Sequence, residues 1–125
     1  MVVGVAIPMI QIKRVYNRPG TQDGLRILVD RVWPRGFSKE RVRMTEWRKE
    51  LAPSTPLRKW FGHDPAKWSE FRKRYRAELK QSGQLDALKA LAQLSSRKTI
   101  TLLYSAADEE HNQAVVLKEL LEELA

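Results

Sequence analysis

The segment from Thr99 to Tyr104 restricts the fold more than any other part of the chain. It is a nearly continuous run of β-favouring residues in which polar and apolar side chains do not alternate. A run of this kind is typical of a strand that is covered on both faces, as strands of parallel sheets are. We therefore expect an α/β fold in which helices cross over between parallel strands.

Two further strands are predicted before this segment. The pattern from Ile10 to Tyr16 indicates a short strand, and the run from Leu25 to Trp33 indicates another. Pro34 ends the second of them because proline has no N–H to donate to a neighbouring strand. Three strands make a narrow sheet, and we expect any additional strand within residues 1–8 or 36–44.

Amphipathic patterns predict helices before and after the last strand. The longest runs from Pro65 to Gln81 and is capped by Asp64. One stripe of this helix faces the core, namely Trp68, Phe71, Tyr75 and Leu79. The other expected helices are a short turn capped by Ser38, a brief helix begun by Thr45, one begun by Thr55, one over Leu85 to Leu94, and one from Asp108 to Leu124.

This order of elements predicts one domain. We expect a single compact, three-layer-like α/β domain over residues 10–125, with a small, mainly parallel sheet of three to five strands and crossover helices. Residues 1–9 are expected to form an N-terminal arm. The length of 125 residues suits one hydrophobic core.

The composition excludes several classes of site. The chain has no cysteine, so it has no disulfide, no cysteine-based metal site and no thiolate nucleophile. The apolar opening from Met1 to Ile10 lacks a basic leader, and no run approaches the roughly 20 apolar residues that span a bilayer. We expect a soluble, cytoplasmic protein without membrane contact and without a cofactor.

Positive charge is concentrated in the middle of the chain. Residues 13–80 hold 19 lysines and arginines against 8 acidic residues, whereas the rest of the chain holds 4 against 7. A basic body of this kind attracts phosphates, nucleic acid or other anions. The alternative is an ordinary solvated surface.

The end of the second strand is suited to holding an anion. Asp30 and Arg31 interrupt an apolar run, and because an unpaired buried charge is costly they are either paired or face a site. Arg31 and Arg35 offer planar guanidinium groups that bind carboxylate or phosphate through two hydrogen bonds, and Gly36 permits close backbone approach. Two interpretations stay open: a free anion site, and an internal salt bridge from Asp30 that fixes the loop.

A second candidate segment follows the last strand. In open α/β sheets, ligands bind beyond the carboxyl ends of the strands, where helix N-termini offer free N–H groups. If the two strands are neighbours, the arginine-bearing segment meets the residues at the start of the last helix: Ser105, Asp108, His111 and Asn112. We expect the two segments together to bind a small anionic ligand, such as a phosphate-bearing metabolite.

Each polar residue of this second segment also has a structural interpretation. Asp108 is most simply an N-cap, with Glu109 and Glu110 complementing the helix dipole. His111 is the candidate catalytic residue, as a general acid or base, or it merely bonds a neighbour. His63 and His111 are too far apart in sequence to match known zinc patterns, so we expect no metal.

The motifs taken together are similar to one bacterial family. Val29–Gly36, Glu46–Trp47 with Lys49–Ser54, Leu57–Pro65, and Thr101–Ala106 with Glu110–Ala114 resemble the domain of unknown function 488. The resemblance runs from about Ile12 to the C-terminus and implies a compact α/β domain without an established activity. Some longer relatives carry Cys-His-Arg where this chain has Asn112-Gln113-Ala114, so no thiol chemistry is carried over.

Three functional hypotheses follow. The first is a pocket that binds a small anion, with or without proton transfer by His111. The second is a nucleic-acid-binding, regulatory protein that places basic residues of the longest helix on phosphates: Arg72, Lys73, Arg74 and Arg76. The third is an interaction module whose acidic final helix docks on another subunit.

Overall fold

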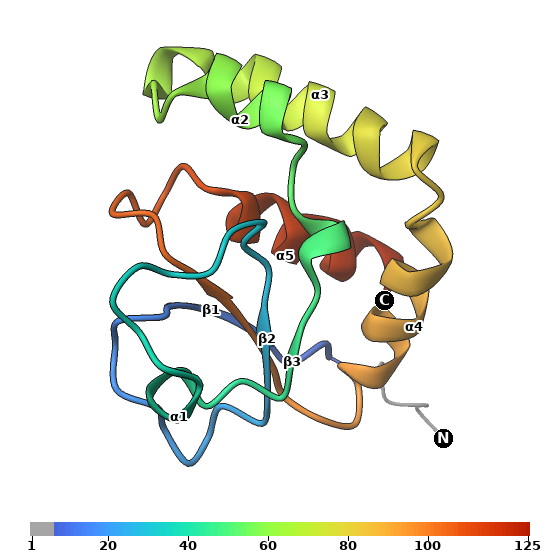
Figure 1. Cartoon of the computed structure of the whole chain (residues 1–125). Coiled ribbons are helices and arrows are strands. Elements are labelled where there is room, and N and C mark those ends of the chain that lie inside the picture. The colour runs from blue at the N-terminus through green and yellow to red at the C-terminus, as the bar shows by residue number, and fades with distance from the viewer. Residues whose placement is uncertain (1–6) are drawn as a thin grey trace, which may run out of the picture.

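Four parallel strands form the centre of the molecule (Figure 1). The computed structural model describes residues 7–125, with strands β1 (Ile10–Arg14), β2 (Leu25–Leu28), β3 (Glu46–Trp47) and β4 (Ile100–Tyr104). They lie in the order β1-β4-β2-β3, and every neighbouring pair is parallel. The structure confirms the expected α/β domain with a small parallel sheet. The N-terminal arm expected over residues 1–9 lies mostly outside the described residues.

β4 lies between β1 and β2 and is buried along its whole length, as the unbroken apolar run predicts. Ile100 is in register with Ile10 on one side and with Leu25 on the other. Gly24 leads into this pairing with φ of 63°, and a Cβ atom at this position would collide with the carbonyl group of Thr99. The close approach of β2 to β4 therefore requires glycine at position 24.

Within residues 7–125, five α-helices and two 3-10 turns complete the fold. They are α1 (Lys39–Val42), η1 (Lys49–Leu51), α2 (Thr55–Phe61), η2 (Pro65–Lys67), α3 (Trp68–Gln81), α4 (Leu85–Leu94) and α5 (Gln113–Leu124). Ser38 and Asp64 accept hydrogen bonds from backbone N–H groups as predicted, at the starts of α1 and η2. The expected long helix is thus divided between η2 and α3.

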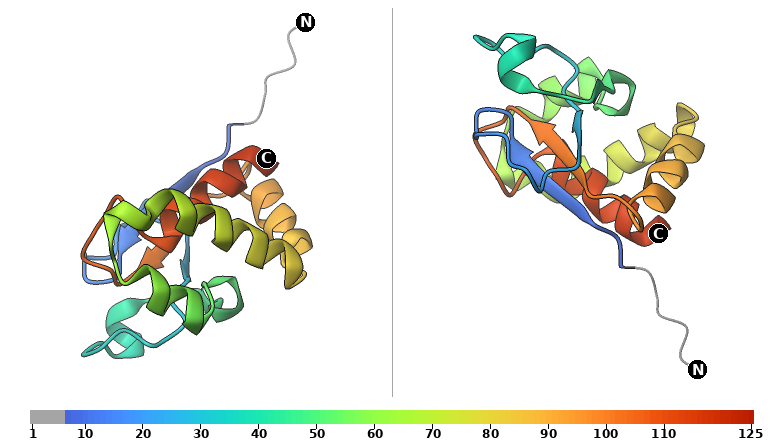
Figure 2. Two further views of the ribbon diagram at one scale, coloured as in Figure 1. Left: turned by 90° about the horizontal axis from the view of Figure 1, so that it is seen from above. Right: turned by 90° about the horizontal axis from the view of Figure 1, so that it is seen from below.

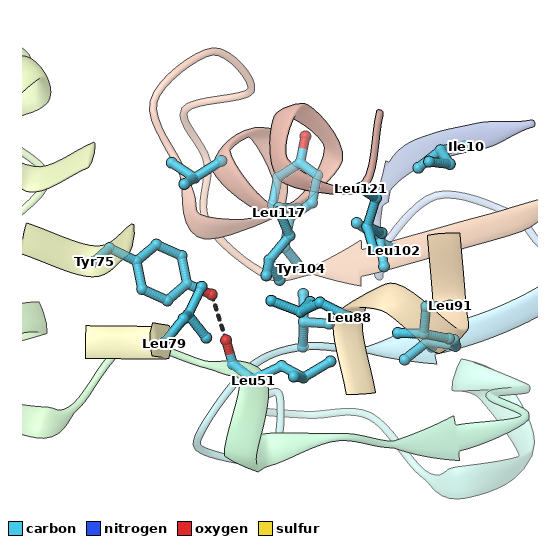
Figure 3. Packing of buried hydrophobic residues seen from close by; sticks show 14 of the residues in the cluster. Ile10, Leu51, Tyr75, Leu79, Leu88, Leu91, Leu102, Tyr104, Leu117 and Leu121 are labelled. Atoms are coloured by element: carbon cyan, nitrogen blue, oxygen red, sulfur yellow. Dashed lines mark hydrogen bonds between the residues drawn. The ribbon is translucent and has the colours of Figure 1, made fainter. Parts of the chain in front are cut away.

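The larger hydrophobic cluster lies on the face of the sheet that α3, α4 and α5 cover. Figure 3 shows its centre, with Tyr75 and Leu79 of α3, Leu88 and Leu91 of α4, and Leu117 and Leu121 of α5 gathered around Leu102 and Tyr104 of β4. Of the predicted stripe on α3, Phe71, Tyr75 and Leu79 are buried and Trp68 is partly buried. The Tyr75 hydroxyl donates to the carbonyl oxygen of Leu51, which ties α3 to η1.

The other face of the sheet has a thinner cover. The sheet lies between α5 and the segment that carries α1 (Figure 2). Val15, Leu28, Val42 and Leu103 form a small buried cluster there. Packed against it are four partly buried residues, Trp33, Phe37, Met44 and Trp47. The arrangement is therefore three-layered, but the third layer is a long loop with a single turn of helix.

Two expectations for residues 36–51 are wrong. Thr45 does not begin a helix, because its Oγ1 accepts a hydrogen bond from the Arg26 amide at 3.0 Å and the next two residues pair with β2 as β3. Only Lys49–Leu51 form a helical turn. The fourth strand therefore lies just beyond residues 36–44, and residues 1–6, the other proposed location, are outside the described part of the chain.

The predicted ends of three elements are also corrected. β1 stops at Arg14 and β2 at Leu28, since the chain turns away from the sheet after each. The last helix begins at Gln113 and not at Asp108. Asp108 caps the preceding turn, where its Oδ1 accepts from the amides of Glu110 at 2.9 Å and His111 at 3.0 Å.

No helix within residues 7–125 has the length and apolar character needed to cross a membrane. The cytoplasmic location stays a prediction.

Candidate functional site

A pocket of about 560 Å³ opens beyond the carboxyl ends of the strands. Its walls come from five segments: Tyr16 after β1, residues 30–35 after β2, residues from Pro53 to His63 around α2, Phe71 of α3, and residues 105–107 with 111–113 after β4. This is the place where α/β sheets usually bind ligands.

The pocket gathers most of the residues that the sequence singles out. Asp30, Arg31, Arg35, Ser105, His111 and Asn112 all line it. Gly36 does not line it. Its φ of 80° belongs to the loop turn, and the space that a Cβ atom would enter is open. Asp108 lies behind His111 and does not line the pocket either.

Asp30 is the buried acid of this pocket. Only 6% of the residue is exposed, and its Oδ1 accepts a hydrogen bond from Gln113 Nε2 at 2.7 Å. Its Oδ2 is also buried, and the side chain and backbone of Ser105 lie near the carboxylate as further hydrogen-bond donors. Burial raises the pKa of Asp30 above its usual 3.8, although nearby Ser105 and Gln113 and the charge of Arg58 oppose the rise.

Arg31 braces the pocket wall. Its Nε donates to the carbonyl oxygen of Pro53 at 2.9 Å, and its Nη2 donates to that of Ala52 at 3.1 Å. It forms no salt bridge with Asp30, so the internal ion pair considered from the sequence is absent from the described residues. Because its partners are neutral carbonyls, the positive charge of Arg31 is not neutralised.

Three exposed cations stand around the pocket. Arg35, Arg58 and Lys59 line it, and the ion pairs within residues 7–125 leave all three without a carboxylate partner. Sequence reasoning identified Arg35 but missed the other two. Leu57 and Phe61 turn one face of α2 into the core, and this helical spacing places Arg58 at the edge of that face. That spacing is the sequence signal from which the position of Arg58 could have been predicted.

His111 belongs to a small polar pair at the pocket wall. Its Nδ1 lies 2.9 Å from Oδ2 of Asp108, and its ring stands edge-on to Trp68 with the ring centroids 5.2 Å apart. Backbone hydrogen bonding from Glu110 and the contact with His111 lower the pKa of Asp108. The pair fixes the orientation of the imidazole. His63 also lines the pocket, where it is exposed.

The first turn of α5 closes one side of the pocket. Asn112 is the N-cap, since its Oδ1 accepts from the Val115 amide at 3.1 Å while its Nδ2 donates to the carbonyl oxygen of Asp108 at 2.9 Å. Both polar atoms of the Asn112 side chain are therefore engaged in hydrogen bonds with the backbone. Gln113, which the sequence did not single out, reaches Asp30 from the first helical position.

The basic residues proposed for nucleic acid lie elsewhere, on α3. Arg72 and Arg76 contact Glu119 at 2.5 and 3.2 Å, and Arg76 also contacts Glu123 at 2.9 Å. Arg74 pairs with Glu70 and covers the ring of Trp60. Lys73 is exposed. Much of this charge is therefore neutralised within the molecule, partly by acids of the C-terminal helix.

No metal site is evident in the part of the chain that the structure describes, where no three metal-ligating side chains come together.

Comparison with known proteins places the chain in a family. The family model described as "Inactive DUF488-N3 subclade" matches residues 9–125. The chain is a member of this subclade. Membership confirms the resemblance to the domain of unknown function 488 that the sequence motifs indicate.

Several relatives of this DUF488-N3 chain share nearly its whole length. "Uncharacterized protein YeaO" of Escherichia coli (strain K12) is 46% identical, and the match covers 92% of this chain and 98% of the relative. "Uncharacterized protein Rv3073c" of Mycobacterium tuberculosis (strain ATCC 25618 / H37Rv) is 38% identical, with 90% and 92% covered. No solved structure gives a significant match.

Proposed function

We propose that this protein binds a small phosphate-bearing anion in the pocket at the carboxyl ends of the strands. One observation carries the proposal: Arg35, Arg58 and Lys59 face a common pocket and have no carboxylate partner among the described residues. Clustered cations that repel one another and have no internal partner are typical of a site for an external anion.

The charge balance of the pocket supports this choice. Four cationic side chains line it, Arg31 included, against one carboxylate among the described lining residues, Asp30. The carboxylate is buried whereas Arg35, Arg58 and Lys59 are exposed, so an anion at the mouth meets the cations first. Guanidinium groups bind phosphate through paired hydrogen bonds, which favours a phosphate over a simple halide.

Binding without catalysis is the form of the proposal that fits best. The matching family model is described as inactive. The pair of His111 and Asp108 resembles part of a catalytic dyad, but the neighbouring Asn112 and Gln113 are occupied by hydrogen bonds that fix the start of α5. We therefore assign His111 to the pocket wall and not to proton transfer.

Calorimetric titration with inorganic pyrophosphate tests the proposal. The wild type is expected to bind it, and Arg58→Met is expected to weaken binding by about tenfold or more, since a charged hydrogen bond is lost. Lys73→Met removes the same charge from an exposed site on α3 and serves as the matched control, with unchanged affinity. Absence of binding to the wild type, or equal losses in the two variants, would refute the proposal.

The nucleic-acid alternative predicts the opposite ranking of the two variants. Binding to α3 would depend on Lys73 and would weaken steeply with added salt, because each phosphate contact releases counterions. Duplex and single-stranded DNA at low salt are the probes. A gel shift that Lys73→Met abolishes and Arg58→Met leaves intact would favour that function over the pocket.

A further inference from the structure

The pocket has an apolar side as well as a cationic one, and the two together point to the class of ligand. We infer that the pocket binds a phosphate monoester that carries an aromatic ring. The phosphate lies at Arg35, Arg58 and Lys59. The ring lies against Tyr16 and Val32. This inference rests on the proposed function, and it names the organic part of the ligand, which a site for phosphate alone would not require.

Two large apolar side chains of the pocket are exposed. Val32 is 60% exposed and Tyr16 is 39% exposed, and both line the pocket. Within residues 7–125, the other large apolar residues that are exposed are Ile7 and Met9, which do not line it. Single exposed apolar residues are common on protein surfaces. Two that share one pocket with the partly buried Trp33 form an apolar wall, and a ligand that removes this wall from water is bound more tightly.

Side-chain contacts hold the aromatic residues of this wall in place. Trp33 Nε1 donates to the carbonyl oxygen of Phe37 at 2.6 Å. The Tyr16 ring stands edge-on to the Phe37 ring with the centroids 4.7 Å apart, and the guanidinium group of Arg14 lies 5.0 Å from the centre of the Tyr16 ring. Tyr16 and Trp33, which follow different strands, therefore meet at Phe37. Because the wall is already ordered, little entropy is lost when a ligand packs against it.

The cationic side and the apolar side come from different parts of the fold. Arg58 and Lys59 lie on α2, whereas Tyr16 follows β1 and Val32 follows β2. In Figure 1, α2 lies above the loops after β1 and β2, so the two groups approach a ligand from different sides. The pocket volume of about 560 Å³ exceeds the needs of a lone phosphate. A ligand that is charged at one end and apolar at the other satisfies both sides.

The lining of the pocket matches a ring better than an alkyl chain. Aromatic and imidazole side chains recur around it: Tyr16, Trp33, Phe61, His63, Phe71 and His111. Aromatic pairs gain more than their buried area alone provides, because the edge of one ring is attracted to the face of another. The guanidinium groups of Arg35 and Arg58 also stack on aromatic faces, as Arg14 does on Tyr16. A saturated group makes neither kind of contact.

Phenyl, cyclohexyl and methyl phosphate provide a direct test, because they share the phosphate and differ in the organic group. Calorimetric titration is carried out at about pH 8, where a phosphate monoester is mostly a dianion. Phenyl phosphate is expected to bind about tenfold tighter or more than methyl phosphate, since the ring leaves water, and also tighter than cyclohexyl phosphate. AMP separates the two sources of such a ligand: tighter binding than phenyl phosphate indicates a nucleotide, and weaker binding indicates an aryl phosphate.

Val32→Ser is the matched variant, because it removes an apolar side chain from the wall and leaves every cation in place. It is expected to reduce the preference for phenyl over methyl phosphate by about threefold or more, with methyl phosphate binding unchanged. Tyr16→Ser is expected to reduce it further, since a whole ring is lost. Ile7→Ser changes a 78% exposed residue outside the pocket and serves as the control, with unchanged affinities. Thermal unfolding shows that each protein is folded.

The outcomes separate this inference from the proposed function. Pyrophosphate binding that depends on Arg58, together with equal wild-type affinities for the phenyl and methyl esters, overturns the inference and leaves the anion site standing. Cyclohexyl phosphate binding as tightly as phenyl phosphate also overturns it, because the pocket would then accept any apolar group. A preference for the phenyl ester that survives in both Val32→Ser and Tyr16→Ser places the ring elsewhere and overturns it too. Absence of binding to pyrophosphate and to all three esters overturns the two proposals together.

Discussion

Gln113 Nε2 donates a hydrogen bond to Asp30 Oδ1 at 2.7 Å and joins residues that are 83 positions apart. The contact links the end of β2 to the first turn of α5, so the two segments on which the pocket depends are held in fixed relation. Asp30 itself is a buried acid, with only 6% of the residue exposed.

Asp30→Asn is expected to raise the free energy of unfolding at about pH 7, where the wild type must keep a buried charge. Burial raises the pKa of Asp30 in the folded protein above the unfolded value of 3.8. The folded state therefore holds this proton more tightly, and the contribution of Asp30 to stability is lost as pH rises from 3.8 through the folded pKa. The advantage of the variant must shrink toward about pH 4.

Chemical denaturation at several pH values measures this difference. Asp108→Asn is the contrasting control, since hydrogen bonds from Glu110 and His111 lower the pKa of Asp108. Its carboxylate contributes stability above the unfolded pKa of 3.8, and that contribution is lost as pH falls through the folded pKa. A gain from Asp30→Asn that does not change with pH would show that its buried charge is not the cause.

Arg31→Met is expected to destabilise the fold by about 2 kcal/mol, because the carbonyl groups of Ala52 and Pro53 lose their donor. Arg35→Met removes an exposed guanidinium that makes no such bond and is expected to change stability by less than about 0.5 kcal/mol. Urea titration of the two variants checks the contrast. Equal effects would mean that Arg31 does not brace the wall between β2 and α2.

Gly24→Ala is expected to be severely destabilising, by about 3 kcal/mol or more, since it combines left-handed backbone with a collision against Thr99. Gly36→Ala has a similarly positive φ of 80° but open space around the added methyl group, so it is expected to cost only about 1 kcal/mol. Thermal unfolding distinguishes the two. A Gly24→Ala protein as stable as Gly36→Ala would contradict the close pairing of β2 with β4.

Glu119→Gln is expected to lower stability by at most about 1 kcal/mol, because Glu119 pairs with Arg72 and Arg76 across α3 and α5 but is partly exposed. The loss should fade in about 1 M salt, which screens exposed charges. Glu122→Gln changes an exposed residue on the same helix and serves as the control. An effect of Glu119→Gln that persists in high salt would point to packing instead of charge.

The sequence predicts the elements with strong patterns and misses those without one. The run from Thr99 to Tyr104 predicts a buried central strand because a short, β-favouring run without polar alternation is typical of a strand that is covered on both faces. β3 has two residues, which is too short to show a periodicity. The Thr45 hydroxyl, although typical of a helix cap, accepts a hydrogen bond from the Arg26 amide instead. Hydrogen bonding to β2 therefore places residues 45–47 in a strand and not in a helix.

The pocket was predictable in location but not in its details. Asp30, Arg35 and His111 stand out as polar residues after buried strands, and the parallel topology brings such residues together. Arg58 was missed because a cation on a short helix looks like part of a solvated face. The sequence predicts Asp108 as the cap of the last helix, whereas Asn112 caps α5 and Asp108 caps the turn before it, because both residue types accept hydrogen bonds from backbone amides.

The central claim is that the pocket holds a phosphate-bearing anion, and an NMR titration with inorganic pyrophosphate tests it most directly. The account predicts backbone amide shifts concentrated after β2, on α2 and at the first turn of α5, around Arg35, Arg58 and Gln113. Shifts gathered instead along α3 around Lys73, or no saturable shifts at all, would contradict it.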